Sequence, residues 1–173
     1  MSDTLATETV RFRIDTAPAL TRLTFAPDRD RALTRAIAAV LEAPLPAPTA
    51  PVVAKAGGGD TLLIWQGPHD FLIETPGALL PALERAVAGK TALLGDAGAG
   101  LVAFTLSGSG VAARLGHDRP GPGLCSRVMR FAALRVAAVW RDETVRLYVD
   151  RSHAAYIRQW LLDRWDAVEM AAG

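Results

Sequence analysis

The elements expected along this sequence occur in the same order twice, and this repetition constrains the fold more than any other feature. In each half, strands and two amphipathic helices alternate. The first half has expected strands at 10–14, 20–25, 61–65, 71–75 and 92–94, with helices after Asp28 and between 75 and 89. The second has expected strands at 101–106, 126–131, 134–140 and 145–149, with helices at 109–115 and after Asp150. This order predicts an α+β fold of two split βαβ units, a tandem ferredoxin-like pseudo-repeat.

Short polar and proline-containing segments set the expected ends of these elements. Asp28 is a candidate N-cap for the first helix and Asp150 for the last one, because a carboxylate can accept from free N–H groups of a first turn. Four prolines between 43 and 51 end the first helix and predict an extended connector.

The chain is expected to form one domain after a short arm. We expect residues 1–9 to form this flexible arm. Residues 10–173 are expected to form one domain whose halves cover about 10–95 and 96–173.

Composition excludes several classes of protein. Half of the 173 residues are hydrophobic and the formal net charge is +1, so the chain can pack a core but has no global field for nucleic acid or an anionic membrane. Cys125 is the single cysteine, which rules out an intrachain disulfide. No apolar run reaches membrane-spanning length, and the first residues do not resemble a secretory signal. The expected location is the cytoplasm.

No group of residues in the sequence forms a self-sufficient catalytic or metal site. Cys125 could be a nucleophile, but no pattern places a base beside it, and a buried thiol is the favoured interpretation. The histidines at 69, 117 and 153 lack metal-ligand spacing. The Ser-Gly-Ser-Gly run at 107–110 could hold phosphate at a helix start, although a plain turn and N-cap is favoured. We therefore expect no catalytic, cofactor-binding or metal-binding residue on this chain.

Arginines on two expected strands are the best candidates for a contact surface. Period-two alternation points Leu134, Val136, Trp140, Val145, Leu147 and Val149 inward and leaves Arg135, Arg141 and Arg146 on the other face. That face is either an ordinary solvated surface or a docking surface, since arginine is favoured at interfaces. Trp160 and Trp165 on the last helix divide in the same way between core and interface.

Ordered motifs between about 60 and 165 resemble one known family. They are Trp65-Gln66-Gly67-Pro68 and its flanking strands, the run LVAFTLSGSGVAARLG from 101 to 116, Cys125, the segment Val149-Asp150-Arg151-Ser152-His153-Ala154, and a Trp-containing last helix. In this order they resemble the gamma subunit of heterotetrameric bacterial sarcosine oxidase, which is related to the folate-binding part of glycine-cleavage T proteins. Residues 69–71 and Val128 depart from the family pattern, which leaves room for another N-methyl amine as substrate.

The resemblance implies a non-catalytic subunit of an oxidoreductase complex that demethylates sarcosine or a related N-methyl amino acid. It places FAD, FMN, NAD and tetrahydrofolate on partner chains, the alpha, beta and delta subunits. It also implies structural roles for Trp65, Gly67, Pro68, Arg151 and Ser152. The alternative is a stand-alone folate-binding protein of the T-protein or iron-sulfur-repair type, although the K-G-C-Y-x-G-Q-E stretch of those proteins is absent. An enzyme that uses Cys125 is a third hypothesis.

Overall fold

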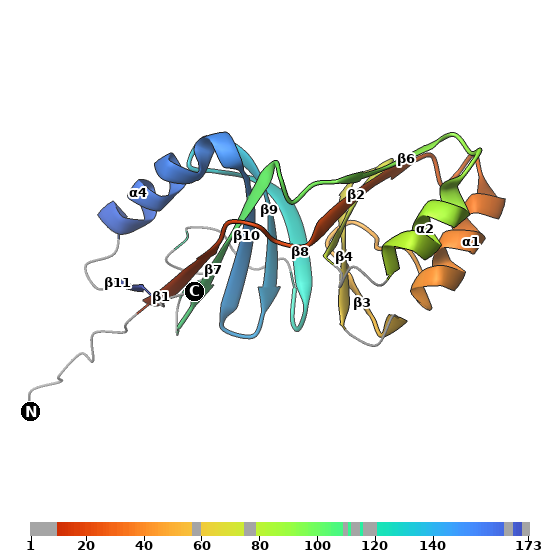
Figure 1. The fold of residues 1–173 in the computed structure, drawn as a ribbon. Helices are drawn as coiled ribbons and strands as arrows, with labels where there is room; N and C mark the ends of the chain where they lie inside the picture. Colours follow the sequence, from red (N-terminus) through yellow and green to blue (C-terminus); the bar gives the residue numbers. More distant parts are fainter. Residues whose placement is uncertain are drawn as a thin grey trace, which may run out of the picture.

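Two β-sheets stack face to face between outer helices in the computed structural model of this chain (Figure 1). The structure describes residues 10–56, 60–74, 79–108, 111, 115, 121–164 and 168–170. Helices α1 (Arg31–Leu41) and α2 (Leu80–Val87) cover the outer side of one sheet, and α4 (Ala154–Arg164) covers the outer side of the other. The architecture is α+β with a tandem ferredoxin-like arrangement, as the element order predicted.

The first half forms a five-stranded antiparallel sheet in the order β3-β4-β5-β2-β6. Its strands are β2 (Leu20–Phe25), β3 (Val52–Ala54), β4 (Thr61–Gly67), β5 (Asp70–Glu74) and β6 (Ala92–Asp96). Helix α1 lies between β2 and β3 in the chain, and α2 lies between β5 and β6. Without the short β3, this is the split βαβ order expected from the sequence.

The second half forms a six-stranded sheet in the order β11-β1-β7-β10-β9-β8. Its strands are β1 (Val10–Asp15), β7 (Leu101–Ser107), β8 (Cys125–Phe131), β9 (Leu134–Arg141), β10 (Thr144–Asp150) and β11 (Val168–Met170). Strand β1 comes from the start of the chain, yet it pairs antiparallel with β7. It occupies the place in this sheet that β6, paired with β2, occupies in the other sheet. The sheet boundary therefore departs from the sequence order at β1.

Three buried layers follow from the alternation of the strands. The outer face of the six-stranded sheet packs against α4 through residues such as Phe104, Trp140 and Ile157, and the outer face of the other sheet packs against α1 and α2. The two inner faces meet through a smaller cluster: Leu20, Ile64, Leu72, Ala103, Ala137, Val139 and Tyr148. Both sheets therefore have buried residues on each face. The second face of β9 and β10 is buried at Ala137, Val139 and Tyr148, while Arg135 and Arg141 at the ends of β9 remain exposed.

Several element ends differ from the sequence expectation. Helix α1 is capped by Asp30, whose carboxylate accepts from the Leu33 N–H at 2.8 Å, so the expected cap at Asp28 is wrong. Asp150 does cap the last helical segment, through a 3₁₀ turn at Arg151–His153 that precedes α4. The predicted helix start at 75–76 lies outside the described residues, as does most of the predicted helix at 109–115. The three-residue strands β3 and β11 were not predicted.

The proline-containing connector docks on the second half. Thr49, at a positive φ of 63°, stands between two alanines that pair with each other, Ala47 and Ala50. Its carbonyl accepts from the Ser126 N–H of β8 at 3.2 Å. The prolines predicted an extended connector, but residues 47–50 form a turn, so that prediction is wrong for the middle of the connector. The connector also adds a hydrogen bond between the two halves.

Two connections carry the chain between the sheets, at 16–19 and 97–100, and Arg151 ties them together (Figure 1). Its guanidinium donates to the carbonyl of Thr16 at 2.5 Å, to that of Ala99 at 2.7 Å and to that of Gly98 at 3.1 Å. The neighbouring Ser152 donates from its N–H and its hydroxyl to the Asp150 carboxylate. The Arg-Ser pair of the sequence motif therefore lies where both connections meet.

We expect Gly98→Ala to lower the free energy of unfolding by about 1–3 kcal/mol, the usual cost of inserting a group into a filled site. A Cβ at Gly98 would lie 2.3 Å from the Pro18 carbonyl oxygen, and backbone cannot move aside as a flexible side chain can. Urea unfolding measures the change. Gly100→Ala in the same turn is the control, because its Cβ would meet nothing closer than 3.8 Å. Equal effects of the two substitutions would contradict the close approach.

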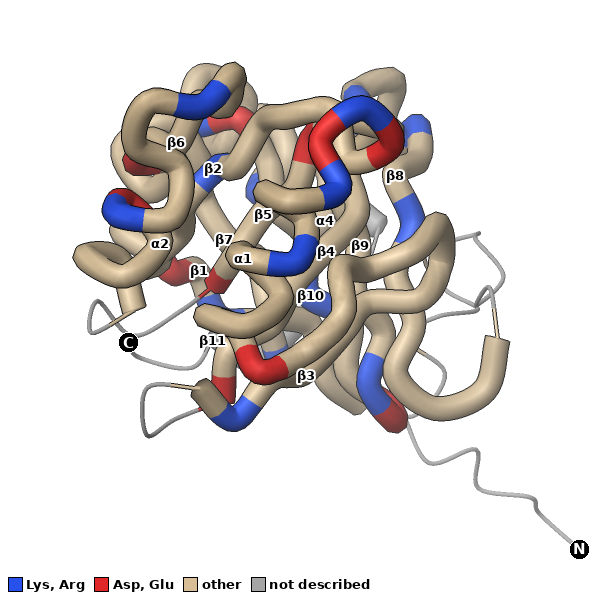
Figure 2. The backbone as a smooth tube through the Cα atoms, turned by 90° about the vertical axis from the view of Figure 1, so that its right-hand side faces the viewer, with Lys and Arg blue, Asp and Glu red and all other residues tan. Residues whose placement is uncertain are grey.

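Charges of both signs are interspersed over the surface. On the side seen in Figure 2, Lys and Arg segments lie among Asp and Glu segments. This agrees with the formal net charge of +1. Within the described part of the chain, no helix is both long enough and apolar enough to cross a membrane.

Candidate functional site

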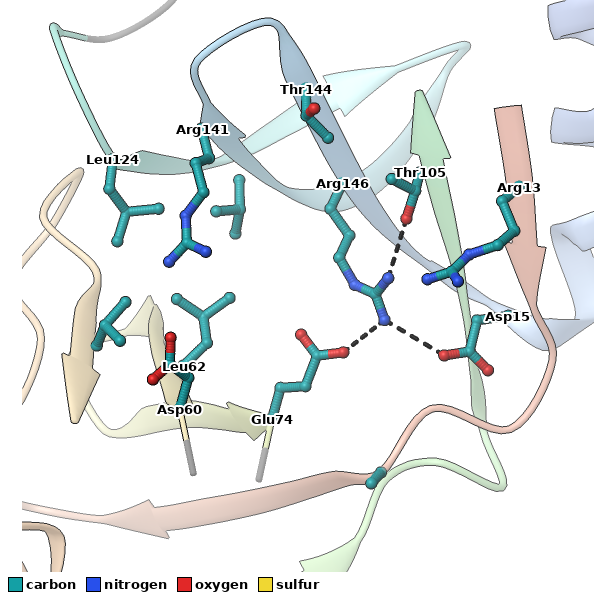
Figure 3. A pocket seen from close by; sticks show the side chains of 13 residues that line it. Arg13, Asp15, Asp60, Leu62, Glu74, Thr105, Leu124, Arg141, Thr144 and Arg146 are labelled. Carbon is teal, nitrogen blue, oxygen red and sulfur yellow. Dashed lines mark hydrogen bonds and ion pairs between the residues drawn. The ribbon is translucent and has the colours of Figure 1, made fainter. Parts of the chain in front are cut away.

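A cavity of about 580 Å³ lies between the two sheets (Figure 3). Its volume is in the range of small-molecule sites. Strands of both sheets line it, so it exists only because the two halves pack together. The lining residues are Arg13, Asp15, Ala19, Val53, Asp60, Leu62, Glu74, Thr105, Leu124, Val139, Arg141, Thr144 and Arg146.

Arg146 on β10 forms the centre of a polar network at one side of this cavity. Its Nη2 donates to Glu74 Oε1 at 2.5 Å and to Asp15 Oδ2 at 3.3 Å, and its Nη1 donates to Thr105 Oγ1 at 2.9 Å. The Tyr148 hydroxyl donates to the other Glu74 oxygen at 2.6 Å. Glu74 belongs to the five-stranded sheet and the other four residues to the six-stranded sheet. The network therefore joins the two halves through charge-assisted hydrogen bonds.

Burial and charge shift two pKa values in this network. Burial raises the pKa of Tyr148 well above its ordinary value, and the adjacent Glu74 carboxylate raises it further because a phenolate there would meet a like charge. For Arg146, burial favours the neutral form, but Glu74 and Tyr148 outweigh it and the pKa is raised. At neutral pH, Tyr148 is a neutral donor and Arg146 a cation.

We expect Tyr148 to make the folded state less stable in alkaline solution. Its folded pKa lies above its unfolded pKa of about 10, so this contribution is complete below pH of about 10 and is lost as the pH rises towards the folded pKa. Tyr148→Phe removes the titration. Free energies of unfolding measured in urea from neutral pH to pH of about 11 should therefore fall more steeply for the wild type than for the variant. Parallel curves would contradict the shift.

Two arginines on the cavity rim have no described partner in a hydrogen bond or an ion pair. Arg13 on β1 and Arg141 at the end of β9 are both exposed. Asp60, also on the rim, is paired with Lys55, and this pairing and, to a smaller extent, the charge of Arg141 lower the pKa of the Asp60 carboxyl. The cations at the cavity mouth, Arg13, Arg141 and Lys55, thus outnumber the Asp60 carboxylate.

The structure describes four of the five residues predicted as a subunit interface and places them in different surroundings. Arg146 lies inside the network, with 17% of its side chain exposed. Arg141 lines the cavity, and Arg135 is exposed while its Nη2 donates to the Gln66 carbonyl of β4 at 2.9 Å. Trp160 packs partly against the core, edge-on to Phe131 with ring centroids 4.7 Å apart. Trp165 lies outside the described residues. An interface role for these residues remains a prediction.

The remaining motif residues lie on the β4–β5 hairpin. Trp65 is partly buried against the α1 and α2 layer, and the pairing register shifts between Trp65 and Gly67. Pro68 is exposed in the turn, and the next carbonyl, that of His69, accepts from Phe25 N–H at 3.0 Å. The hairpin turn is thereby fixed to the end of β2.

None of the reactive residues considered in the sequence lines the cavity, as far as the structure describes them. Cys125 is buried, with 3% of its surface exposed, and its thiol donates to the Gly121 carbonyl at 3.4 Å. His69 lies 3.8 Å from Asp28, and His153 is exposed at the 3₁₀ turn. Among the described residues, no group of three or more His, Cys, Asp or Glu side chains could hold a metal ion. His117 and residues 109–110 lie outside the described part.

Comparison with known proteins tests the family resemblance of the sequence motifs. No protein-family model and no curated protein matches the sequence. Among solved structures, a chain of heterotetrameric sarcosine oxidase from Corynebacterium sp. U-96, in complex with pyrrole 2-carboxylate, matches 94% of this chain and 88% of its own length at 26% identity, with a TM-score of 0.76. The sarcosine oxidase resemblance is confirmed.

A second match shows how widely the fold is shared. The glycine cleavage system aminomethyltransferase T from Bartonella henselae matches 95% of this chain with a TM-score of 0.56. Its identity is 16%, and the match covers 48% of the aminomethyltransferase chain. This likeness concerns the fold alone. The sarcosine oxidase match, in contrast, spans nearly all of both chains.

Proposed function

We propose that this chain is a gamma-type, non-catalytic subunit of a heterotetrameric sarcosine oxidase that demethylates sarcosine or a related N-methyl amino acid. FAD, FMN, NAD and tetrahydrofolate would be bound by its alpha, beta and delta partners. The observation that carries the proposal is the match to a chain of a heterotetrameric sarcosine oxidase over 94% of one chain and 88% of the other. A match of that extent fits a whole subunit better than a shared module.

The engagement of reactive side chains in structural contacts supports a non-catalytic role. The Cys125 thiol is buried and bonded to a backbone carbonyl, whereas a nucleophilic thiolate needs access and a positive neighbour. The Glu74 carboxylate accepts from Arg146 and Tyr148 with its two oxygens. A carboxylate held in this way is a poor general base, because protonation would break two charge-assisted hydrogen bonds.

Co-purification from the native host tests the subunit role. We expect the tagged chain to bring down a flavin-containing protein whose eluate oxidises sarcosine or another N-methyl amino acid. The absence of flavin and of this activity from the eluate would refute the proposal. A captured protein without flavin would not support it.

A charge reversal tests the predicted interface within the same experiment. Arg135→Glu should reduce the recovered flavin about tenfold or more if Arg135 faces a partner, since removing one partner of a buried interfacial charge pair costs about 2 kcal/mol or more. Arg85→Glu is the matched control, because Arg85 is an exposed arginine on α2, beyond the other sheet. Equal recovery with both variants would remove Arg135 from the interface while leaving the subunit role intact.

Titration with tetrahydrofolate tests the alternative function, a stand-alone folate-binding protein. The likeness to the aminomethyltransferase is one of fold and does not favour either function. Micromolar binding by the isolated chain would favour the alternative. Binding that requires the co-purified flavoprotein would favour the subunit role.

A further inference from the structure

We propose that the cavity between the two sheets is a binding site for a small organic anion with a compact apolar body, whose acidic group is held by Arg141. This assignment is independent of the subunit role, because it concerns a cavity within one chain. It rests on the charge balance of the cavity, on the groups around Arg141 and on the division of the lining into a polar and an apolar part.

The charge balance favours an anion. Arg13, Lys55, Arg141 and Arg146 oppose the carboxylates of Asp15, Asp60 and Glu74 at or beside the cavity. Arg146 engages both Asp15 and Glu74, and Lys55 engages Asp60. One guanidinium offsets only one of its two carboxylates, and the charge of Arg141 also acts on Asp60, so the four cations exceed the three carboxylates by one. Arg13 and Arg141 remain as cations without a described ion-pair partner.

The groups around Arg141 suit an acidic group. Figure 3 shows its guanidinium directed into the cavity, towards Leu62 and Asp60 and beside Leu124. Thr144 lies directly opposite Arg141 in the β9–β10 pairing and also lines the cavity. A guanidinium provides a planar fork of donors, and the threonine hydroxyl can add another. Both kinds of donor match a carboxylate or a sulfonate.

The apolar wall of the cavity accounts for the rest of the ligand. Val53, Leu62, Leu124 and Val139 line the cavity. Figure 3 shows Leu62 and Leu124 near the guanidinium of Arg141. An apolar body placed there would be withdrawn from water, while its acidic group reached the rim. Arg13, on the far side of Arg146, provides a cation for a second acidic group. A small inorganic ion would leave this apolar wall uncovered.

A matched pair of dyes tests the assignment on the full-length chain. We would titrate 8-anilinonaphthalene-1-sulfonate, an apolar body with one acidic group, and N-phenyl-1-naphthylamine, the same ring system without that group. The expected result is saturable fluorescence with one site per chain for the sulfonate. Its affinity should be at least about tenfold higher than that of the neutral dye, as one hydrogen bond to a charged group accounts for that much.

Substitutions locate the bound dye. Arg141→Met should weaken sulfonate binding about tenfold or more and leave the neutral dye unchanged. Arg127→Met is the control, because Arg127 is an exposed arginine on the neighbouring strand β8 and does not line the cavity. Equal affinity for the sulfonate in both variants, equal binding of the two dyes, or no saturable site would overturn the proposal. The co-purification result does not affect any of these outcomes.

Discussion

Replacing Arg146 with methionine is expected to lower the free energy of unfolding by about 2–4 kcal/mol. Methionine keeps most of the apolar stem but removes the cation that holds Asp15 and Glu74. Removing one partner of a fully buried pair costs about 3–5 kcal/mol, because the other charge is left unpaired. Here 25% of the Glu74 and 35% of the Asp15 side chain is exposed, so solvent screens part of that cost. Urea unfolding at neutral pH measures the loss.

Two further variants test whether the loss of stability comes from the network itself and not from the removal of any arginine. Arg13→Met changes another arginine of the same cavity, one without a described ion pair, and should alter stability by less than about 0.5 kcal/mol. Glu74→Gln in the Arg146→Met background should recover part of the loss, since it removes the unpaired carboxylate and leaves an acceptor for Tyr148. If Arg146→Met behaves like Arg13→Met, the network does not join the halves energetically.

One face of β9 and β10 was predicted from the sequence and the other was not. Period-two alternation placed Trp140, Val145 and Leu147 inward, and they are buried under α4. The same alternation allowed either a solvated or a docking surface on the opposite face, yet Val139 and Tyr148 on that face are buried within the chain, at 4% and 3% exposure. These two apolar side chains among the arginines were the signal of a second buried face. In a strand that is buried on both faces, apolar residues no longer alternate regularly with polar ones, so a period-two pattern cannot identify both buried faces.

The cavity could not be predicted from local sequence patterns. Glu74 and Arg146 are 72 residues apart, and Asp15 and Arg146 are 131 apart, so no spacing rule relates them. Their proximity depends on how the two sheets stack and on β1 crossing into the sheet of the second half. The helix caps show a smaller limit. Asp28 and Asp30 are both suitable caps, and the turn that makes the Asp30 N–H donate to the Ala26 carbonyl decides between them.

The motif resemblance provided what local patterns could not. Composition does not distinguish Arg151 from the other arginines of the chain. Only its position in the Val149–Ala154 motif predicted a structural role for it. In the structure it bonds carbonyls of both inter-sheet connections, more than 50 and more than 130 residues away. A motif can therefore record a long-range contact whose residues carry no local pattern.

Trp140→Ala is expected to have the other large effect, a loss of about 3–5 kcal/mol in the free energy of unfolding. Trp140 is 1% exposed and is among the largest fully buried side chains of the described residues. Its removal would leave a cavity beneath α4 that the packed sheet cannot close. Trp160→Ala is the control for loss of an indole, because Trp160 is only partly buried and should cost clearly less.

Trp140→Phe distinguishes the packing of the indole from its hydrogen bonding. The Trp140 Nε1–H is buried and has no hydrogen-bond partner among the described residues, and an unsatisfied buried donor costs about 1–3 kcal/mol. Phenylalanine removes that donor while filling most of the space, so the lost volume and the removed penalty should nearly cancel, with a net change within about 1 kcal/mol. Urea unfolding of the two variants side by side measures the difference. If Trp140→Phe costs as much as Trp140→Ala, the indole N–H is satisfied in solution and packing alone does not explain why tryptophan occupies this position.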